Sequence, residues 1–180
     1  SAALSKFCYQ HFQETPVTAI ELNPNVINIC RNAFHLPEND QRLQVIQTDA
    51  SDYIESMKIK NGIDIIQVDL YDENAAAPVF DSPEFYKSCA DSLTPDGMMT
   101  VNIFGDESNR TKSIEAIQEN FDSVVWLPEV DGGNIVVLAF KKSPELSFEE
   151  LFLRAKRIKR ETKLKAVQWV NHFHSWMKDI

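Results

Sequence analysis

Apolar residues recur along the chain with two different periods. Six short runs rich in branched apolar residues predict β-strands, which typically fill about four to eight positions: 17–22, 43–48, 63–68, 98–104, 124–127 and 135–140. Apolar residues at helical spacing predict α-helices at 2–12, 24–36, 49–57, 82–93, 109–121, 147–158 and 166–177. Strands and helices therefore alternate along most of the chain.

Polar residues mark several element boundaries. Asn23-Pro24 and Ser82-Pro83 each place a cap residue before a proline at the first helical position. Ser147 and Glu150 have the spacing of a capping box. The segment Thr94-Pro95-Asp96-Gly97 is typical of a turn.

The alternation predicts an α/β fold with a mostly parallel sheet and helices on both faces. The run 63–68 is short and β-branched, which predicts a strand buried on both faces. The loop Asp131-Gly132-Gly133 is typical of a hairpin, so the last strand should run antiparallel. A terminal hairpin favours a Rossmann-like, methyltransferase-type sheet over six parallel strands. We expect a nucleoside-binding domain over 1–146 and a helical extension, 147–180, packed on it.

Charge is unevenly distributed. The net charge of the 180 residues is −9, which does not favour a nucleic-acid partner. Residues 147–180 hold eight basic and four acidic side chains, a net of +4, so residues 1–146 hold ten and 23, a net of −13. A basic tail on an acidic body suggests internal docking or a partner contact. The sequence predicts no membrane partner, because no apolar run approaches the ~20 residues that span a bilayer.

Cysteine and histidine placement argues against disulfides and metals. Cys8, Cys30 and Cys89 are odd in number and lack metal spacing, which fits a reducing, cytoplasmic setting. His172 and His174 are two positions apart, so a helix would put them on different faces, and we expect no metal site. The aromatic residues of the last helix repeat at helical spacing, which favours a core or partner-facing role over base stacking: Trp169, Phe173 and Trp176.

Four acids lie at or after the ends of predicted strands and are the candidates for chemistry, because ligands of open α/β sheets bind outside the carboxyl ends of the strands. Asp69 and Asp72 could orient and deprotonate an amine, or could cap the next loop or helix. Glu21 could accept two hydrogen bonds from a ribose diol, or could be a solvated acid. Asp49 could contact an adenine amino group beside the small Ala50, could cap the following helix, or could do both.

These segments together resemble the spermidine synthase (polyamine aminopropyltransferase) family of the class I methyltransferase fold. The resemblance covers about residues 17 to 104 and rests on the order and spacing of five segments: Val17-Thr-Ala-Ile-Glu-Leu-Asn-Pro24, Thr48-Asp-Ala50, Ile63-Asp-Ile-Ile-Gln-Val-Asp-Leu-Tyr-Asp72, Phe85-Tyr86 and Leu93-Thr-Pro-Asp-Gly97.

The resemblance implies a role for each site residue. Asp69 would be the base that activates the amine, and Asp72 would help to hold a diamine. The co-substrate would be decarboxylated S-adenosylmethionine, or S-adenosylmethionine itself, with no tightly bound cofactor. Its ribose would bind Glu21 and its adenine would meet Asp49 and Ala50. Leu22, Leu70 and Asp69 complete the implied cofactor-binding set.

The chain departs from the family pattern in two ways, which concern the wall of the pocket and the extent of the chain. The family has Asp-Ser-Ser-Asp-Pro where this chain has Asp69-Leu-Tyr-Asp-Glu73, so Leu70 and Tyr71 alter the pocket wall. The family's N-terminal β-domain, its first central strand and its glycine-rich loop have no counterpart in the chain, which suggests a fragment.

Three functions remain open. The first is aminopropyl transfer to a polyamine such as putrescine, with a small-molecule amine as partner and a homodimer as the assembly that the family suggests. The second, motivated by Leu70 and Tyr71, is S-adenosylmethionine-dependent methyl transfer. The third is a non-catalytic binding domain.

Overall fold

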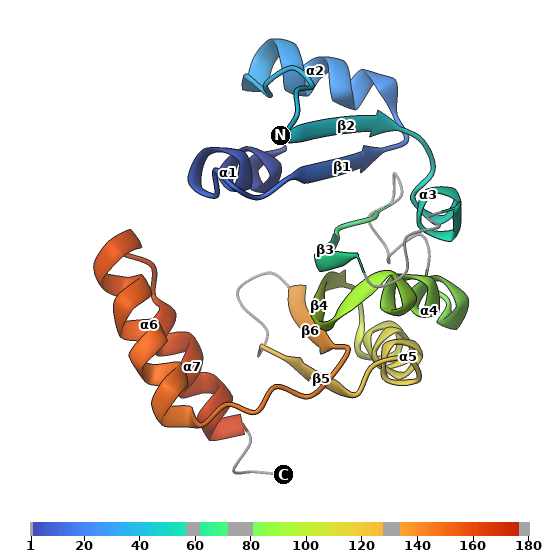
Figure 1. Ribbon diagram of the computed structural model, residues 1–180. Helices are drawn as coiled ribbons and strands as arrows, with labels where there is room; N and C mark the ends of the chain where they lie inside the picture. The colour runs from blue at the N-terminus through green and yellow to red at the C-terminus, as the bar shows by residue number, and fades with distance from the viewer. Residues whose placement is uncertain (1, 57–61, 72–80, 128–133, 177–180) are drawn as a thin grey trace. The chain divides into compact units, whose positions relative to one another are not determined.

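The computed structural model describes residues 2–56, 62–71, 81–127 and 134–176, with side chains described up to residue 173. The chain divides into two units, Ser1–Lys58 and Ile59–Ile180. Each unit contains its own β-sheet, with two strands in the first and four in the second (Figure 1).

The first unit consists of three helices and two parallel strands. Their bounds agree with the predicted ones to within two residues: α1 Ala3–His11, β1 Val17–Glu21, α2 Pro24–Phe34, β2 Leu43–Gln47 and α3 Ala50–Ser56. β1 pairs with β2 from Val17 opposite Leu43 to Glu21 opposite Gln47. The buried residues Cys30, Leu36 and Leu43 form its core. The predicted cap of α2 is confirmed, because the Asn23 side chain accepts a hydrogen bond from the backbone N–H of Asn25.

The second unit contains the remaining strands in the order β3-β4-β6-β5. Its elements are β3 Ile63–Val68, α4 Pro83–Ser92, β4 Leu93–Phe104, α5 Glu107–Gln118, β5 Ser123–Trp126, β6 Asn134–Phe140, α6 Phe148–Thr162 and α7 Ala166–Trp176. β3 and β4 are parallel, whereas β6 is antiparallel to both β4 and β5. The predicted antiparallel last strand is confirmed, although the loop Asp131-Gly132-Gly133 lies outside the described residues.

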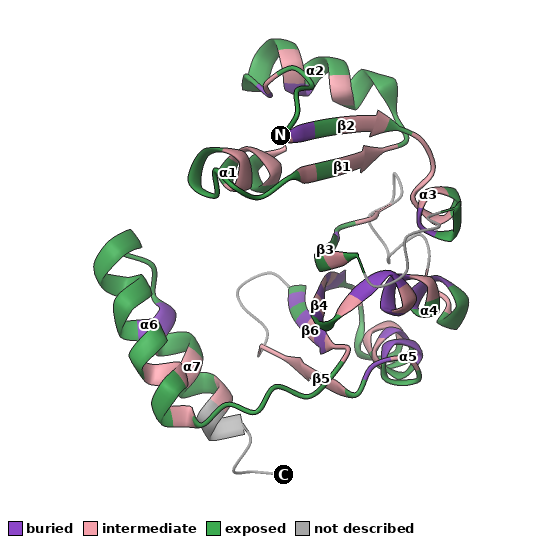
Figure 2. Ribbon diagram, in the orientation of Figure 1, coloured by how far each residue is buried: buried purple, intermediate pink, exposed green. Residues whose placement is uncertain are grey.

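The core of the second unit is built from alternate positions of β4 and β6. Met99, Val101 and Ile103 of β4 are fully buried, and so are Val137 and Ala139 of β6. Figure 2 shows this burial on the two central strands and on α4. A strand points successive side chains to opposite faces, so this alternation places one face of β4 and β6 against the core.

The prediction that the strand 63–68 is buried on both faces is wrong. Within β3, Val68 alone is buried, and the side chain of Ile65 is 57% exposed. Among the described strands β3 pairs with β4 alone, so it lies at an edge of its sheet. Branched apolar composition predicted the strand correctly, but composition does not determine what packs against each face of a strand.

The predicted turn at 94–97 lies inside β4. Leu93 pairs with Ile63, but the next partner along β3, Ile65, pairs with Met98. The extra residues of β4 therefore form a bulge between these two pairs. A Cβ atom on Gly97 would lie 3.0 Å from the Thr94 carbonyl oxygen and 3.1 Å from that of Ile63, which explains the glycine at the end of this bulge.

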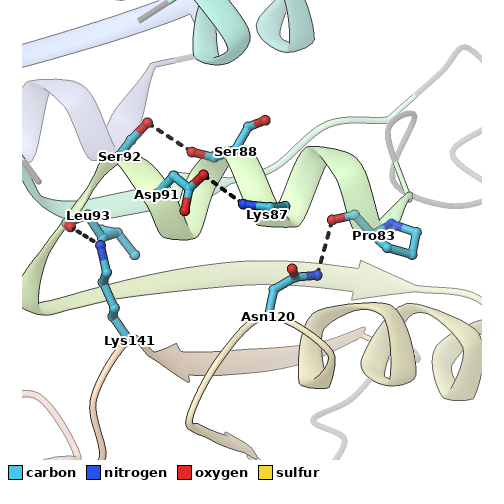
Figure 3. A network of polar contacts seen from close by, with 8 residues as sticks. All are labelled: Pro83, Lys87, Ser88, Asp91, Ser92, Leu93, Asn120 and Lys141. Carbon is cyan, nitrogen blue, oxygen red and sulfur yellow. Dashed lines mark hydrogen bonds and ion pairs between the residues drawn. The ribbon is translucent and has the colours of Figure 1, made fainter. Parts of the chain in front are cut away.

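Polar contacts fix both ends of α4 (Figure 3). The Ser82 side chain caps the helix by accepting a hydrogen bond from the backbone N–H of Phe85, as predicted. Asn120, which follows α5, donates to the Pro83 carbonyl at 3.1 Å, and Lys141, which follows β6, donates to the Leu93 carbonyl at 2.6 Å. These contacts join segments that are far apart in sequence and hold the start of β4 in place.

The last two helices form a hairpin with the predicted start. Ser147 and Glu150 form the complete capping box at the beginning of α6. The packing of residues 147–180 on the preceding domain stays a prediction. Among the described residues, no helix has the length and apolar character that crossing a bilayer requires.

Candidate active site

In the first unit, Glu21 is the last residue of β1. Its Oε1 atom accepts a hydrogen bond from the backbone N–H of Asn23 at 2.8 Å, and its side chain is half-buried. Its backbone carbonyl accepts a hydrogen bond from the N–H of Thr48 at 3.2 Å, so the ends of β1 and β2 lie side by side. Leu22, the next residue, is 63% exposed.

Asp49 follows β2 and caps α3, as predicted. Its Oδ1 atom accepts hydrogen bonds from the backbone N–H groups of Ser51 at 2.8 Å and Asp52 at 3.2 Å. Ala50 is the first residue of the helix. One carboxylate oxygen carries both cap bonds, and the adenine contact stays a prediction.

The structure thus brings four predicted residues to one end of the strands in the first sheet. Glu21 pairs with Gln47 in the parallel register, so the residues that follow the two strands emerge at the same end: Glu21, Leu22, Asp49 and Ala50. This is the carboxyl end of the parallel strands, where α/β sheets bind their ligands.

In the second unit, Asp69 and Leu70 follow β3 directly. Asp69 is exposed, and its Oδ1 atom accepts a hydrogen bond from the Asn102 side-chain Nδ2 at 3.0 Å. The Asn102 Oδ1 atom in turn accepts a hydrogen bond from the Nδ2 of Asn134 at 3.0 Å. Asp72 lies outside the described residues.

Tyr71 lies beside the same carboxylate. Its hydroxyl donates a hydrogen bond to the backbone carbonyl of Asn102. Burial raises the pKa of Tyr71, and the negative charge of Asp69 raises this pKa further, while a backbone hydrogen bond from Phe104 opposes both effects. Tyr71 therefore stays a protonated hydrogen-bond donor at neutral pH.

Sequence reasoning missed Asn102 and Asn134. Both are uncharged, and Asn134 follows the segment 128–133, so neither drew notice as an acid or a histidine would. A usable signal existed for Asn102: it lies near the carboxyl end of β4, the strand beside β3, where polar residues gather around ligands.

A second polar cluster is structural. Asp81 accepts hydrogen bonds from the Tyr86 hydroxyl at 3.0 Å and the Ser113 hydroxyl at 2.7 Å, joining α4 to α5. Tyr86 and Ser113 are both fully buried. Burial and the neighbouring charge of Asp81 raise the pKa of Tyr86 far above its ordinary value of 10, so the phenol stays neutral.

No group of three or more His, Cys, Asp and Glu side chains within the described ranges has the arrangement of a metal site. A surface hollow of about 520 Å³ lies on the α6–α7 hairpin and is lined by four cations and one apolar residue: Lys156, Lys159, Arg160, Lys163 and Val167. Positive charge there would repel a cationic amine, so this hollow does not suit such a substrate.

Glu21 and Asp49 belong to one unit and Asp69 to the other. The convergence of these acids on one adenosine-sized hollow therefore stays a prediction.

Comparison with known proteins identifies the family. The model of the spermine/spermidine synthase domain matches residues 8–150. The chain belongs to the spermine/spermidine synthase domain family. The resemblance that the strand-end acids indicated is thereby confirmed.

The relatives of this chain include proteins with different names, and the chain covers different shares of their lengths. The polyamine aminopropyltransferase of Neisseria meningitidis serogroup A is 30% identical over 150 residues, which are 82% of this chain and 56% of that protein. The eEF1A lysine and N-terminal methyltransferase of Xenopus laevis is 24% identical over 179 residues, which are 93% of this chain and 25% of that protein. The chain thus spans about half the length of the first relative and a quarter of the second.

A solved structure confirms the fold of this family member. Human methyltransferase-like protein 13, in complex with SAH, superposes with a TM-score of 0.77 at 21% identity, covering 88% of this chain and 76% of that one. The predicted α/β, methyltransferase-type fold is therefore correct.

Proposed function

We propose that this chain is the nucleoside-binding and catalytic part of an aminopropyltransferase. It moves an aminopropyl group from decarboxylated S-adenosylmethionine to an amine such as putrescine. The observation that carries this proposal is Asp69, an exposed carboxylate at the carboxyl end of β3 with one oxygen held by Asn102. The Asn102 bond goes to Oδ1, and in this proposal Oδ2 is the atom that receives the proton of the amine. Family membership and the name of the Neisseria relative add support.

The chemistry that this carboxylate can perform is proton removal. A diamine arrives as a dication, and the negative charge of Asp69 attracts it. Asp69 takes one proton from the attacking ammonium, which frees the nitrogen lone pair. The nitrogen then attacks the carbon beside the sulfonium sulfur. A C–N bond forms, the C–S bond breaks, and its electron pair neutralises the sulfonium as a thioether of adenosine. The proton leaves from Asp69 to solvent, and Asp72 would hold the second ammonium.

The co-substrate would bind through the residues that the family resemblance assigns to it. Glu21 would accept hydrogen bonds from the ribose diol, since its backbone contact occupies Oε1 and leaves Oε2. Asp49 and Ala50 would meet the adenine, and Leu22 and Leu70 would supply apolar contacts. Loss of a hydrogen bond to a charged acceptor costs about 1.5–3 kcal/mol, so Glu21 should matter for binding.

The test is turnover of the full-length protein with putrescine and decarboxylated S-adenosylmethionine. Replacing a general base typically costs about 10²–10⁴-fold in rate, so Asp69→Asn should lower kcat by at least ~100-fold. Asp64→Asn is the matched control, because Asp64 is an exposed acid of β3, the strand that Asp69 follows, and its carboxylate contacts Thr94 instead. Background turnover by the wild type, or full activity of Asp69→Asn, would refute the proposal.

A second candidate is methyl transfer from S-adenosylmethionine. Tyr71, a half-buried ring where the family pattern has serine, leaves less room beside Asp69 for a diamine. The Xenopus relative is named as a methyltransferase, which supports the same reading. Calorimetry separates the two candidates: tighter binding of decarboxylated S-adenosylmethionine supports aminopropyl transfer, whereas tighter binding of the carboxylated form supports methyl transfer.

We also propose a cellular setting and an assembly. Cys8, Cys30 and Cys89 are all free thiols, which supports a reducing, cytoplasmic compartment. A homodimer remains our expectation for the assembly.

A further inference from the structure

Hydrogen bonds link Asp69 to Asn102, and link Asn102 in turn to two further side chains, those of Tyr71 and Asn134. These four residues are called the Asp69 network below. Asn102 comes from β4, Asn134 begins β6, and Tyr71 follows β3. The strand order β3-β4-β6 puts these segments next to one another.

The hydrogen bonds of the Asp69 network run in one direction. An ionised carboxylate only accepts hydrogen bonds, so the Asn102 amide must present its NH₂ group to Asp69. The Asn102 oxygen then faces Asn134, which must donate in its turn. A reversed Asn102 amide would place its oxygen against the carboxylate and its NH₂ group against another NH₂ group. The carboxylate therefore sets the orientation of the Asn102 amide, and the bond from Asn134 supports the same orientation.

The backbone of Asn102 is held as firmly as its side chain. The Tyr71 hydroxyl donates to the Asn102 carbonyl, and Asn102 pairs with Val136 of β6 in the sheet. Because burial raises the pKa of Tyr71, the hydroxyl stays protonated and this donor persists at neutral pH. Asn102 is thus anchored to both β3 and β6.

We propose that Asn102 is the positioning residue of Asp69: it holds Oδ1 so that Oδ2 faces the attacking amine. This inference rests on the proposed function of Asp69 as the base. A base must lie within hydrogen-bond reach of its proton and in the right orientation, and a freely rotating carboxylate would satisfy that geometry only part of the time. Asn102 therefore acts through Asp69 and has its effect on kcat.

The main test uses alanine variants of the full-length protein. Asn102→Ala should lower kcat by about tenfold to a hundredfold, the loss expected for a hydrogen bond to a charged group, and should change the diamine KM by less than about twofold. Asn134→Ala should give a smaller loss, because Asn102 keeps its bond to Asp69 and loses only the supporting bond from Asn134. Asn102→Gln, which keeps the amide, should recover part of the lost kcat.

Asn120→Ala is the matched control. Asn120 belongs to the same unit, and its amide also makes hydrogen bonds, but these go to the Pro83 and Ala116 carbonyls. It should lower the thermal midpoint without lowering kcat. Equal kcat losses in Asn102→Ala and Asn120→Ala would mean that Asn102 is merely structural, which would overturn the proposal.

A double-mutant cycle and an NMR measurement separate this inference from the proposed function. In the Asp69→Asn background, Asn102→Ala should cost no further activity, and an undiminished further loss would overturn the proposal.

The NMR measurement uses the protein without ligand. The chemical shifts of the Asn102 side-chain amide should change in Asp69→Ala and should stay the same in Asn120→Ala. Unmoved resonances overturn the inference even if the wild type is active. Moved resonances with an inactive wild type overturn the proposed function and leave the contact established.

Discussion

Two acids at strand ends each use one carboxylate oxygen for a local structural bond. Glu21 and Asp49 each accept hydrogen bonds from backbone N–H groups two or three residues further on, through one oxygen. These local bonds orient each side chain at the end of its strand before any ligand is present. Asp69 is held differently, because its partner is a side chain of another strand.

Asp40 shows how a fully engaged carboxylate links stability to pH. Its Oδ2 accepts a hydrogen bond from the Tyr9 hydroxyl at 2.6 Å, and its Oδ1 accepts from the backbone N–H groups of Arg42 and Leu43. The Tyr9 bond, followed by the backbone bonds of Leu43 and Arg42, lowers the pKa of Asp40 below its ordinary value of 3.8. The contact joins α1 to the start of β2.

Because the pKa of Asp40 is lowered in the folded state, the direction in which its contribution to stability changes with pH is fixed. Asp40 contributes its stability above pH 3.8, the ordinary value, and loses it as the pH falls through the lower folded value. Asp40→Asn should therefore lower the urea midpoint at pH 7, and the difference from wild type should shrink on acidification. Tyr9→Phe removes the largest single contact and should show the same trend more weakly. If the difference in urea midpoint between wild type and Asp40→Asn did not change with pH, this account would be contradicted.

At the scale of elements, cap residues decided where helices begin, but the predicted turn at 94–97 did not decide where β4 begins. That segment forms a bulge within a continuous strand, which starts at Leu93. The Lys141 backbone N–H donates to the Gly97 carbonyl, which ties the bulge to the end of β6.

Gly97→Ala should destabilise the second unit. The added Cβ would lie 3.0 Å from the Thr94 oxygen and 3.1 Å from the Ile63 oxygen, and these backbone atoms belong to paired strands that cannot easily shift. Overpacking typically costs about 1–3 kcal/mol, and we expect a loss in that range from urea unfolding. Asp96→Ala is the control, since Asp96 is exposed in the same bulge and should change stability little. Equal stability of Gly97→Ala and wild type would mean that the bulge relaxes freely.

At the scale of the whole molecule, charge is separated along the chain. Residues 1–146 carry a net charge of −13 and residues 147–180 one of +4, as counted from the sequence. The acidic part includes every proposed ligand-binding residue. A field of that sign attracts cationic substrates over distances that salt shortens.

The proposed diamine KM should therefore depend on ionic strength. Raising NaCl from about 0.02 to 0.2 M shortens the screening length to under about 10 Å and should raise the KM severalfold. Thermal midpoints in the same buffers check that the fold is unchanged. A KM that stays constant across this range would show that long-range attraction contributes nothing to binding.

The sequence by itself determined the element order, most boundaries and the placement of Glu21, Asp49 and Asp69 at strand ends. These features depend on local physics: apolar periodicity, and side-chain bonds to backbone groups two or three residues away. Only the tertiary structure decided that β3 lies at a sheet edge with Ile65 exposed. It also decided the partners of Asp69, because Asn102 lies 33 positions from Asp69 and Asn134 lies 32 from Asn102. Strand pairing brings such residues together, and the local sequence around a residue does not show which distant residue will lie beside it.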